Sequence, residues 1–162
     1  MSVRADGPRG SLLLRTRGRG GLLIERRANN IVLRGGAALI ANLFTGGPAG
    51  KSIDTLGVGF ATEPATAELT ALTPPPAAAS IPAAALVTPL TAASFQVVID
   101  QANAVQVKIA AVFKPVKDLD NVTEAGILAG TALYNQVIFE PVSLHVGQDV
   151  TFFWQIDFPF GH

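Results

Sequence analysis

The chain has 162 residues, of which 49% are hydrophobic and 15% charged, and it contains no cysteine, which excludes disulfide bonds, thiol nucleophiles and thiolate metal sites. Its most apolar stretch, residues 77–87, is interrupted by Ser80 and Pro82 and is shorter than the roughly 20 residues of a membrane-spanning helix, so we expect no membrane insertion. The formal net charge is zero, but residues 1–34 hold eight arginines against two carboxylates, a net charge of +6, and the other residues carry −6.

Residues 1–28 are predicted to form a basic, extended N-terminal arm, because they are rich in arginine and glycine. The arm has three possible roles: pairing with carboxylates on adjacent subunits, contacting the phosphates of a nucleic acid, or remaining solvated. Subunit docking is favoured over nucleic acid, since the arm has no aromatic residue for base stacking. The arginines expected to make subunit contacts are Arg4, Arg9, Arg15, Arg17, Arg19, Arg26 and Arg27.

Residues 29–162 are predicted to form a single domain that begins with a short helix. Apolar residues recur at the spacing of one helical face over residues 39–44, and the Gly-Gly-Pro at residues 46–48 is a typical helix end. The apolar run at residues 56–61 predicts a buried strand. Clustered prolines among alanines then predict a long Pro/Ala-rich loop at about residues 72–92.

Alternating apolar and polar residues dominate the second half of the chain. They predict an antiparallel pair of strands at residues 95–100 and 105–113, a strand at 133–140 and a last strand at 151–158. The predicted fold class is therefore mainly β, an antiparallel β-sandwich with one short helix near the N-terminal third and the extended arm. The residues expected in its core include Val107, Ile109, Phe152, Trp154, Ile156 and Phe158.

The segment Gly46–Ser52 approaches the phosphate-binding pattern G-x-x-x-x-G-K-[ST]. Thr45, however, occupies the position of the first glycine. The pattern also needs a strand before it and a helix after it, whereas here a helix is expected before and a strand after. We therefore predict an ordinary loop.

No constellation of catalytic residues is evident in the sequence. His145 is expected in a turn at residues 145–149, and His162 ends the chain; neither has partners at a ligand spacing. Asp118 and Asp120 predict a polar turn, since a calcium loop needs more oxygen ligands. We therefore predict no catalytic residue, no metal site and no cofactor, and a protein that is not an enzyme.

A succession of segments suggests a known family. The segments are Asn30 to Leu43, Gly57-Val-Gly59, Glu68-Leu69, Val105 to Phe113, Thr123-Glu-Ala-Gly-Ile127 and Trp154 to Phe158. In this order they resemble the amino-terminal tail-collar type domain of phage tail and tail-fibre attachment proteins. The resemblance covers roughly residues 29–160 and lies in the succession, because no single motif is specific.

This resemblance implies a structural component of a phage virion or phage-like tail, made in the bacterial cytoplasm. It would assemble with copies of itself and with other virion proteins. The arginine-rich leader and the lack of fibrous repeats after residue 160 depart from the family pattern. Two alternatives remain: a host-surface or glycan-binding module, for which Tyr134 is the obvious exposed aromatic candidate, and a nucleic-acid-associated protein that uses the basic arm.

Overall fold

The computed structural model of the chain describes residues 8–18, 20–45, 52–63, 66–99 and 102–160. It is mainly β, with 53% of residues in strands and one α-helix, which confirms the predicted class. The strands are Arg9–Arg17 (β1), Leu23–Val32 (β2), Thr55–Gly59 (β3), Val87–Pro89 (β4), Phe95–Val98 (β5), Ala104–Phe113 (β6), Leu119–Ala129 (β7), Ala132–Leu144 (β8) and Val150–Pro159 (β9). The helix α1 spans Arg34–Thr45.

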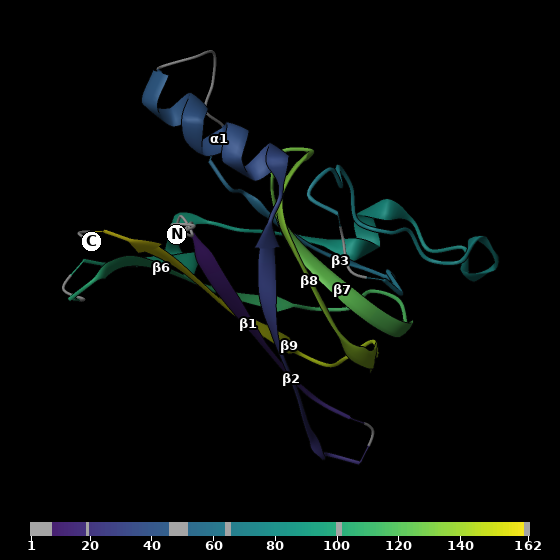
Figure 1. Ribbon diagram of the computed structural model, residues 1–162. Helices are drawn as coiled ribbons and strands as arrows, with labels where there is room; N and C mark the ends of the chain where they lie inside the picture. The colour runs from purple at the N-terminus through teal and green to yellow at the C-terminus, as the bar shows by residue number, and fades with distance from the viewer. Residues whose placement is uncertain (1–7, 19, 46–51, 64–65, 100–101, 161–162) are drawn as a thin grey trace.

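The strands of the described residues form one curled antiparallel sheet, a half-barrel, in the order β4-β3-β7-β8-β2-β1-β9-β6-β5. Figure 1 shows β7 and β8 facing β1, β9 and β6 across the core. The β-sandwich of two separate sheets is not confirmed. The reason is β2, which pairs with β1 over most of its length and with β8 at Ile31 and Val32, and so joins the two halves.

The extended N-terminal arm is likewise not confirmed, because Arg9–Arg17 and Leu23–Val32 are strands in the middle of the sheet. Leu12, Leu14 and Thr16 are buried, and the residues between them face away from the core. Such alternation is what a half-buried strand requires. The arginine and glycine content suggested an unpacked segment, but the alternation of buried and exposed residues along β1 shows a strand.

The last strand, β9, lies at the centre of the core, as its alternation predicted. Phe152, Trp154 and Ile156 are buried, and the ring of Phe152 packs edge-on against Phe113 of β6 at 6.4 Å between centroids. Ile109 is also buried, whereas Val107 and Phe158 pack on the core while partly exposed. The predicted antiparallel pair of β5 and β6 is confirmed by its register.

Helix α1 covers part of the inner side of the sheet and contacts β8. Leu39 and Ile40 pack on the core, as the helical periodicity predicted. Gly36 lies against the backbone of Tyr134, where no side chain could fit. The rest of the predicted apolar face does not pack, since Leu43 and Phe44 are exposed.

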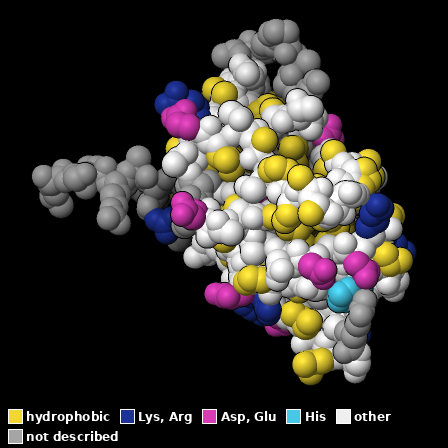
Figure 2. All heavy atoms as spheres, turned by 90° about the vertical axis from the view of Figure 1, so that its right-hand side faces the viewer, with side chains coloured by type: hydrophobic (Ala, Val, Ile, Leu, Met, Phe, Trp, Pro, Cys, Tyr) yellow, Lys and Arg dark blue, Asp and Glu magenta, His cyan; other side chains and the backbone are white. Residues whose placement is uncertain are grey.

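The Pro/Ala-rich segment is mostly irregular, as expected, with three short 3₁₀ helices and the three-residue strand β4. Residues 69–99 contain no charged residue, and most of residues 74–93 are exposed. Figure 2 views the side of the molecule that is at the right of Figure 1. Apolar side chains spread over the middle of this side, and charged groups lie mainly toward its rim. The molecule therefore exposes a large surface with little charge.

Strand β7 was not predicted, because Asp118 and Asp120 were interpreted as part of a polar turn. The structure has a strand from Leu119 to Ala129, in which Val122, Ala125 and Ile127 are completely buried. Its pairing with β8 contains register shifts, and Asn121 has a φ of 58°. Both irregularities interrupt the apolar-polar alternation from which a strand is recognised.

Arg26 ties β2 to β8 where their pairing stops. Continuing the register of Ile31 with Gln136 would place β2 beside Glu140 and Pro141, but the ladder ends at Ile31. In the gap, the Arg26 guanidinium donates hydrogen bonds to the carbonyl oxygens of Glu140 and Pro141, each at 3.0 Å. A third bond, of 2.9 Å, reaches the carbonyl oxygen of Glu25. Arg26 thus has a role within the fold, and its subunit contact stays a prediction.

We expect Arg26→Ala to lower the free energy of unfolding by about 1–3 kcal/mol, because three carbonyl oxygens lose a charged donor. Arg27→Ala is the matched control. Its side chain is 71% exposed, and its loss should change stability by no more than about 0.5 kcal/mol. Urea unfolding followed by circular dichroism measures both. Equal effects of the two substitutions would contradict the role assigned to Arg26.

The two outer strands of the sheet differ in how they are protected. Strand β4 has three residues and ends at Pro89, which has no N–H to donate. Strand β5 contains neither proline nor a charged residue, and Val97 on it is 60% exposed. Proline, charge and short length are the usual means of blocking an edge, so only the β4 edge is blocked.

Candidate functional site

Four of the predicted contact arginines lie on one face of the sheet. In an antiparallel pair, directly opposed residues share a face, and Leu13 opposes both Arg27 of β2 and Phe153 of β9. Phe153 in turn opposes Ala110 of β6. We call this surface the solvent face; it consists of the odd-numbered residues of β1, β2 and β9 and the even-numbered residues of β5 and β6. It carries Arg9, Arg15, Arg17 and Arg27.

The other predicted contact residues are placed differently. Arg26 points away from the solvent face and binds β8, as described above. Arg4 and Arg19 lie outside the described residues, so their contact role stays a prediction. The arginines were expected to act from an arm; instead, strand alternation places four of them on one surface. Their odd numbers, against the buried even-numbered leucines of β1, are the signal in the sequence that could have shown this.

An exposed aromatic ring lies near the middle of the solvent face. Phe153, on β9, is 40% exposed, and the guanidinium carbon of Arg15 lies 5.9 Å from the centre of its ring. Arg15 also donates to a carboxylate oxygen of Glu25 at 2.6 Å. A cation above an aromatic ring is a favourable arrangement, and it holds Arg15 beside the ring. In the sequence, Phe153 is the one residue that breaks the alternation of β9.

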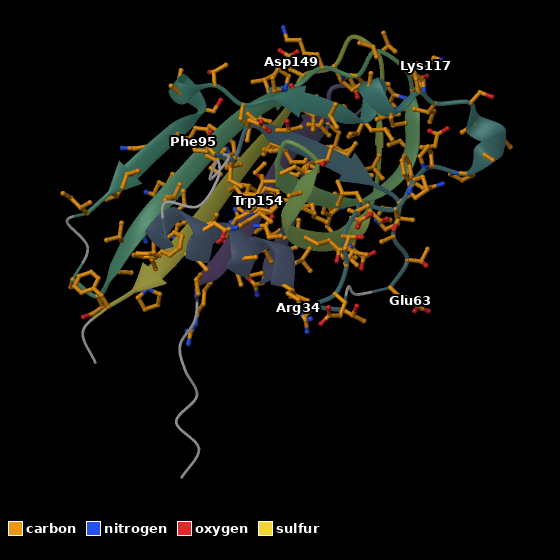
Figure 3. The ribbon with its side chains drawn as sticks, turned by 90° about the horizontal axis from the view of Figure 1, so that it is seen from above. Arg34, Glu63, Phe95, Lys117, Asp149 and Trp154 are labelled. Atoms are coloured by element: carbon orange, nitrogen blue, oxygen red, sulfur yellow. The ribbon has the colours of Figure 1, made fainter. Side chains whose placement is uncertain are left out.

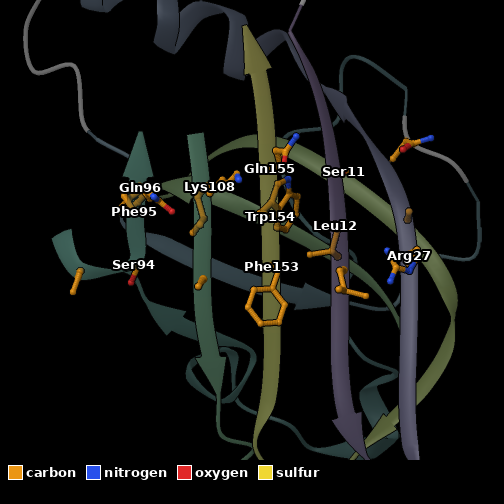
Figure 4. A pocket seen from close by; sticks show the side chains of 16 residues that line it. Ser11, Leu12, Arg27, Ser94, Phe95, Gln96, Lys108, Phe153, Trp154 and Gln155 are labelled. Carbon is orange, nitrogen blue, oxygen red and sulfur yellow. The ribbon is translucent and has the colours of Figure 1, made fainter. Parts of the chain in front are cut away.

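A groove of about 770 Å³ crosses the solvent face around this ring. Figure 4 shows Phe153 with Lys108 to one side and Arg27 to the other, and with Gln155 and Ser11 nearby. Trp154 and Leu12, whose backbone also borders the groove, turn their side chains into the core. No carboxylate is among the residues that line the groove. Its polar neutral side chains are those of Ser11, Asn29, Ser94, Gln96 and Gln155.

Charge is divided between the solvent face and the rest of the described molecule. The face carries five cations against two carboxylates, a net charge of +3; the charged residues are Arg9, Arg15, Arg17, Arg27, Lys108, Glu25 and Asp157. The other described residues hold four cations against eight carboxylates, a net charge of −4. The net charge is positive in the first 34 residues of the sequence and negative in the remainder. In the fold, the net charge is correspondingly positive on the solvent face and negative over the other described residues.

Buried polar side chains gather on the other half of the sheet, around Glu124. This side chain on β7 is fully buried. Its Oε2 accepts hydrogen bonds from the backbone N–H groups of Thr73 at 2.9 Å and Ala61 at 3.3 Å. Its Oε1 accepts a bond from the side-chain amide of Gln136 on β8. Gly59 leaves the space that this carboxylate occupies. The cluster fastens the segment between Ala61 and Thr73 to the sheet, which is a structural role.

His145 and Asp118, which were expected in turns, lie close to each other. His145 lies in the expected turn, where the N–H of Gln148 bonds to its carbonyl oxygen at 3.1 Å. Its Nδ1 is 3.6 Å from a carboxylate oxygen of Asp118, which also accepts from the N–H of Val146 at 2.9 Å. Asp120 belongs to β7 rather than to a turn. Within the described ranges, no group of three or more His, Cys, Asp or Glu side chains is arranged to hold a metal ion.

Two further sequence candidates are placed by the structure. Tyr134, the expected exposed aromatic, is only 3% exposed on β8, and burial raises the pKa of its hydroxyl. It therefore cannot be a loop residue that contacts a host surface.

Residues 46–51 of the loop that resembles a phosphate-binding loop lie outside the described residues, and so does His162. The helix α1 before that loop and the strand β3 after it are in the predicted order.

Several exposed apolar side chains lie at or just beyond the C-terminal ends of α1, β5 and β9; in Figure 1, α1 ends at the upper left of the molecule and β9 at its left. We call this surface the apolar end; its members are Leu43, Phe44, Val97, Ile99 and Phe160, and all are at least 48% exposed. Phe44 is 87% exposed. A cavity of about 160 Å³ opens beside Leu43 between α1 and the inner side of β6 and β9, and apolar side chains form most of its wall.

Comparisons with protein-family models, with curated proteins and with solved structures find no match for this chain. Among the described residues, no helix combines the length and apolar character needed to span a bilayer.

Proposed function

We propose that this chain is a non-enzymatic structural component of a phage virion or phage-like tail, and that it acts by assembling with copies of itself and with other proteins of the particle. The succession of segments from Asn30 to Phe158 that resembles tail-collar domains supports the phage context. The single observation that carries the assembly role is the apolar end. Its five large side chains would lie in water in an isolated molecule, at a cost of about 25 cal/mol for each Å² left exposed.

Two features favour another protein as the occupant of the apolar end. The cavity beside Leu43 has an almost entirely apolar wall, so it suits an apolar side chain from a neighbouring subunit. Exposed apolar patches rimmed by polar residues commonly mark protein contacts. Val97 and Ile99 end the charge-free run of residues 69–99, so the described part of this segment brings no charge of its own to a contact.

The oligomeric state tests this proposal. We expect size-exclusion chromatography with light scattering to give a discrete oligomer whose mass exceeds the 16.8 kDa of one chain. Substituting Phe44→Ser together with Ile99→Ser should weaken association at least about tenfold. Each substitution removes a large apolar side chain from the contact, and burying such a side chain contributes a free energy of the order of 1.5–3 kcal/mol. In purified particles, mass spectrometry should find the chain in many copies.

Val116→Ser is the matched control, since Val116 is equally exposed, at 70%, but lies in the turn before β7. It should leave the mass unchanged. A wild-type protein that stays monomeric up to its solubility limit would contradict assembly through the apolar end. So would an oligomer that Val116→Ser disrupts as strongly as the double substitution does.

A further inference from the structure

We propose that the groove around Phe153 on the solvent face binds an acidic carbohydrate chain. This surface is distinct from the apolar end, and the proposal does not depend on how the chain assembles. A surface suited to such a ligand is concave and combines charge, hydrogen-bonding groups and an exposed ring. The groove of about 770 Å³ is the one that combines all three.

The charges of the groove select an anion with separated negative groups. No carboxylate lines it, whereas Arg27 and Lys108 stand at its two sides; Arg27 also lies 3.8 Å from a carboxylate oxygen of Glu25, which is outside the groove. Arg27 is on β2 and Lys108 on β6, and two strands, β1 and β9, lie between them. Three strand spacings correspond to about 14 Å. A ligand lying across the strands could therefore bring one anionic group to each cation.

The centre of the groove suits a sugar ring. Sugars present C–H faces that pack on aromatic rings, and Phe153 offers a ring that is 40% exposed. Arg15, at 5.9 Å from the centre of that ring, adds a cation beside it. Around the ring are amide and hydroxyl side chains, which both donate and accept hydrogen bonds and therefore match sugar hydroxyls. They belong to Ser11, Asn29, Ser94, Gln96 and Gln155.

Carbohydrate fits this surface better than an acidic peptide or a nucleic acid. Strands β1, β9 and β6 are paired on both sides, so their backbone groups are not available to an added peptide strand. A single-stranded nucleic acid has a phosphate on every nucleotide and usually stacks successive bases on several aromatic rings. Among the residues that line the groove, Phe153 is the one aromatic side chain that points out from the middle of the face.

The test uses isothermal titration with four probes: a galacturonic acid hexamer, neutral maltohexaose, poly-L-glutamate and a twelve-nucleotide oligothymidylate. We expect the uronate hexamer to bind and the other three to bind at least about tenfold more weakly. Phe153→Ala should weaken binding of the hexamer at least about tenfold, through loss of stacking. Arg27→Gln and Lys108→Gln should each weaken it about three- to tenfold and reduce its dependence on salt concentration.

Two variants control for folding and for nonspecific charge. Phe153→Tyr keeps an aromatic ring and should keep binding within about threefold of wild type. Arg34→Gln removes another exposed arginine, one paired with Glu68 at 2.6 Å and lying away from Phe95 at the groove margin (Figure 3); it should leave affinity unchanged. Failure of the wild-type protein to bind the hexamer at millimolar concentration would overturn the proposal. So would tighter binding of poly-L-glutamate or oligothymidylate, or an unchanged affinity in Phe153→Ala.

Discussion

Glu124→Ala is expected to lower the free energy of unfolding by about 3–5 kcal/mol. The substitution removes the acceptor of three hydrogen bonds at a fully buried position. The N–H groups of Ala61 and Thr73 and the amide of Gln136 would then be left without this partner inside the protein. Buried donors without an acceptor cost about 1–3 kcal/mol each. Urea unfolding monitored by the fluorescence of Trp154 measures the change.

Glu124→Gln is the informative control for that experiment. The new amide can keep its oxygen toward Thr73 and Ala61, provided that its nitrogen then donates to Gln136. Gln136 can accept by turning its own amide over, because its oxygen and nitrogen have nearly the same shape. We expect a loss of no more than about 1.5 kcal/mol. A loss as large as that of Glu124→Ala would show that the negative charge, rather than the set of hydrogen bonds, holds the segment in place.

Deletion of residues 1–27 is expected to abolish folding rather than to release a flexible arm. The deletion removes β1, which lies between β2 and β9, and about half of β2. It takes Leu12 and Leu14 out of the core and exposes Phe152 and Trp154 beside the gap. Each buried leucine contributes about 2–5 kcal/mol when truncated to alanine, and a domain is stable by only about 5–15 kcal/mol in total.

Near-ultraviolet circular dichroism and sedimentation of the expressed protein measure the outcome. The matched control is deletion of residues 1–7, which keeps every strand of the described chain and should give a folded protein. A soluble product of the longer deletion, with the near-ultraviolet spectrum of the full chain, would contradict the central position of β1.

Much of the fold could be predicted from the second half of the sequence. Strand β9 and the second half of β6 alternate because one side of each packs on the core and the other lies toward solvent. The helix α1 was evident from Leu39 and Ile40, which both pack inward. In these elements, burial follows the local period of the residues, so local pattern was sufficient.

Strand β1 was predicted only as part of an extended arm and β7 was missed, for different physical reasons. In β1, Arg15 and Arg17 dominate the composition, and the buried Leu14 and Thr16 between them are a weak signal. In β7, nearly all residues from Glu124 to Ala129 are buried whichever side they face, so the run from Ala125 to Ala129 is apolar or glycine and shows no alternation. Gly126 in that run allows close packing, because a side chain there would meet the carbonyl oxygen of Asn135 and the side chains of Leu133 and Leu72.

The candidate site could be predicted only in part, because it is assembled from strands distant in the chain. The arginines were identified as surface residues, but their common surface required the pairing of β1 with both β2 and β9. Lys108 and Arg27 are 81 positions apart in the sequence, and no local pattern connects them. Phe153 breaks the alternation of its strand, but a single exposed apolar residue is common on protein surfaces and does not by itself indicate a site.

The unequal edges of the sheet limit how sheet pairing between copies could proceed. Strand β5 leaves its outer backbone groups available, whereas β4 is short and ends at Pro89. Two copies that paired through β5 would form one continuous sheet with a β4 strand at each of its ends. Neither end could then accept a third copy, so hydrogen-bonded growth is self-limiting at two chains. The unpaired edge of β5 therefore permits pairing of two copies but not growth of a long fibril.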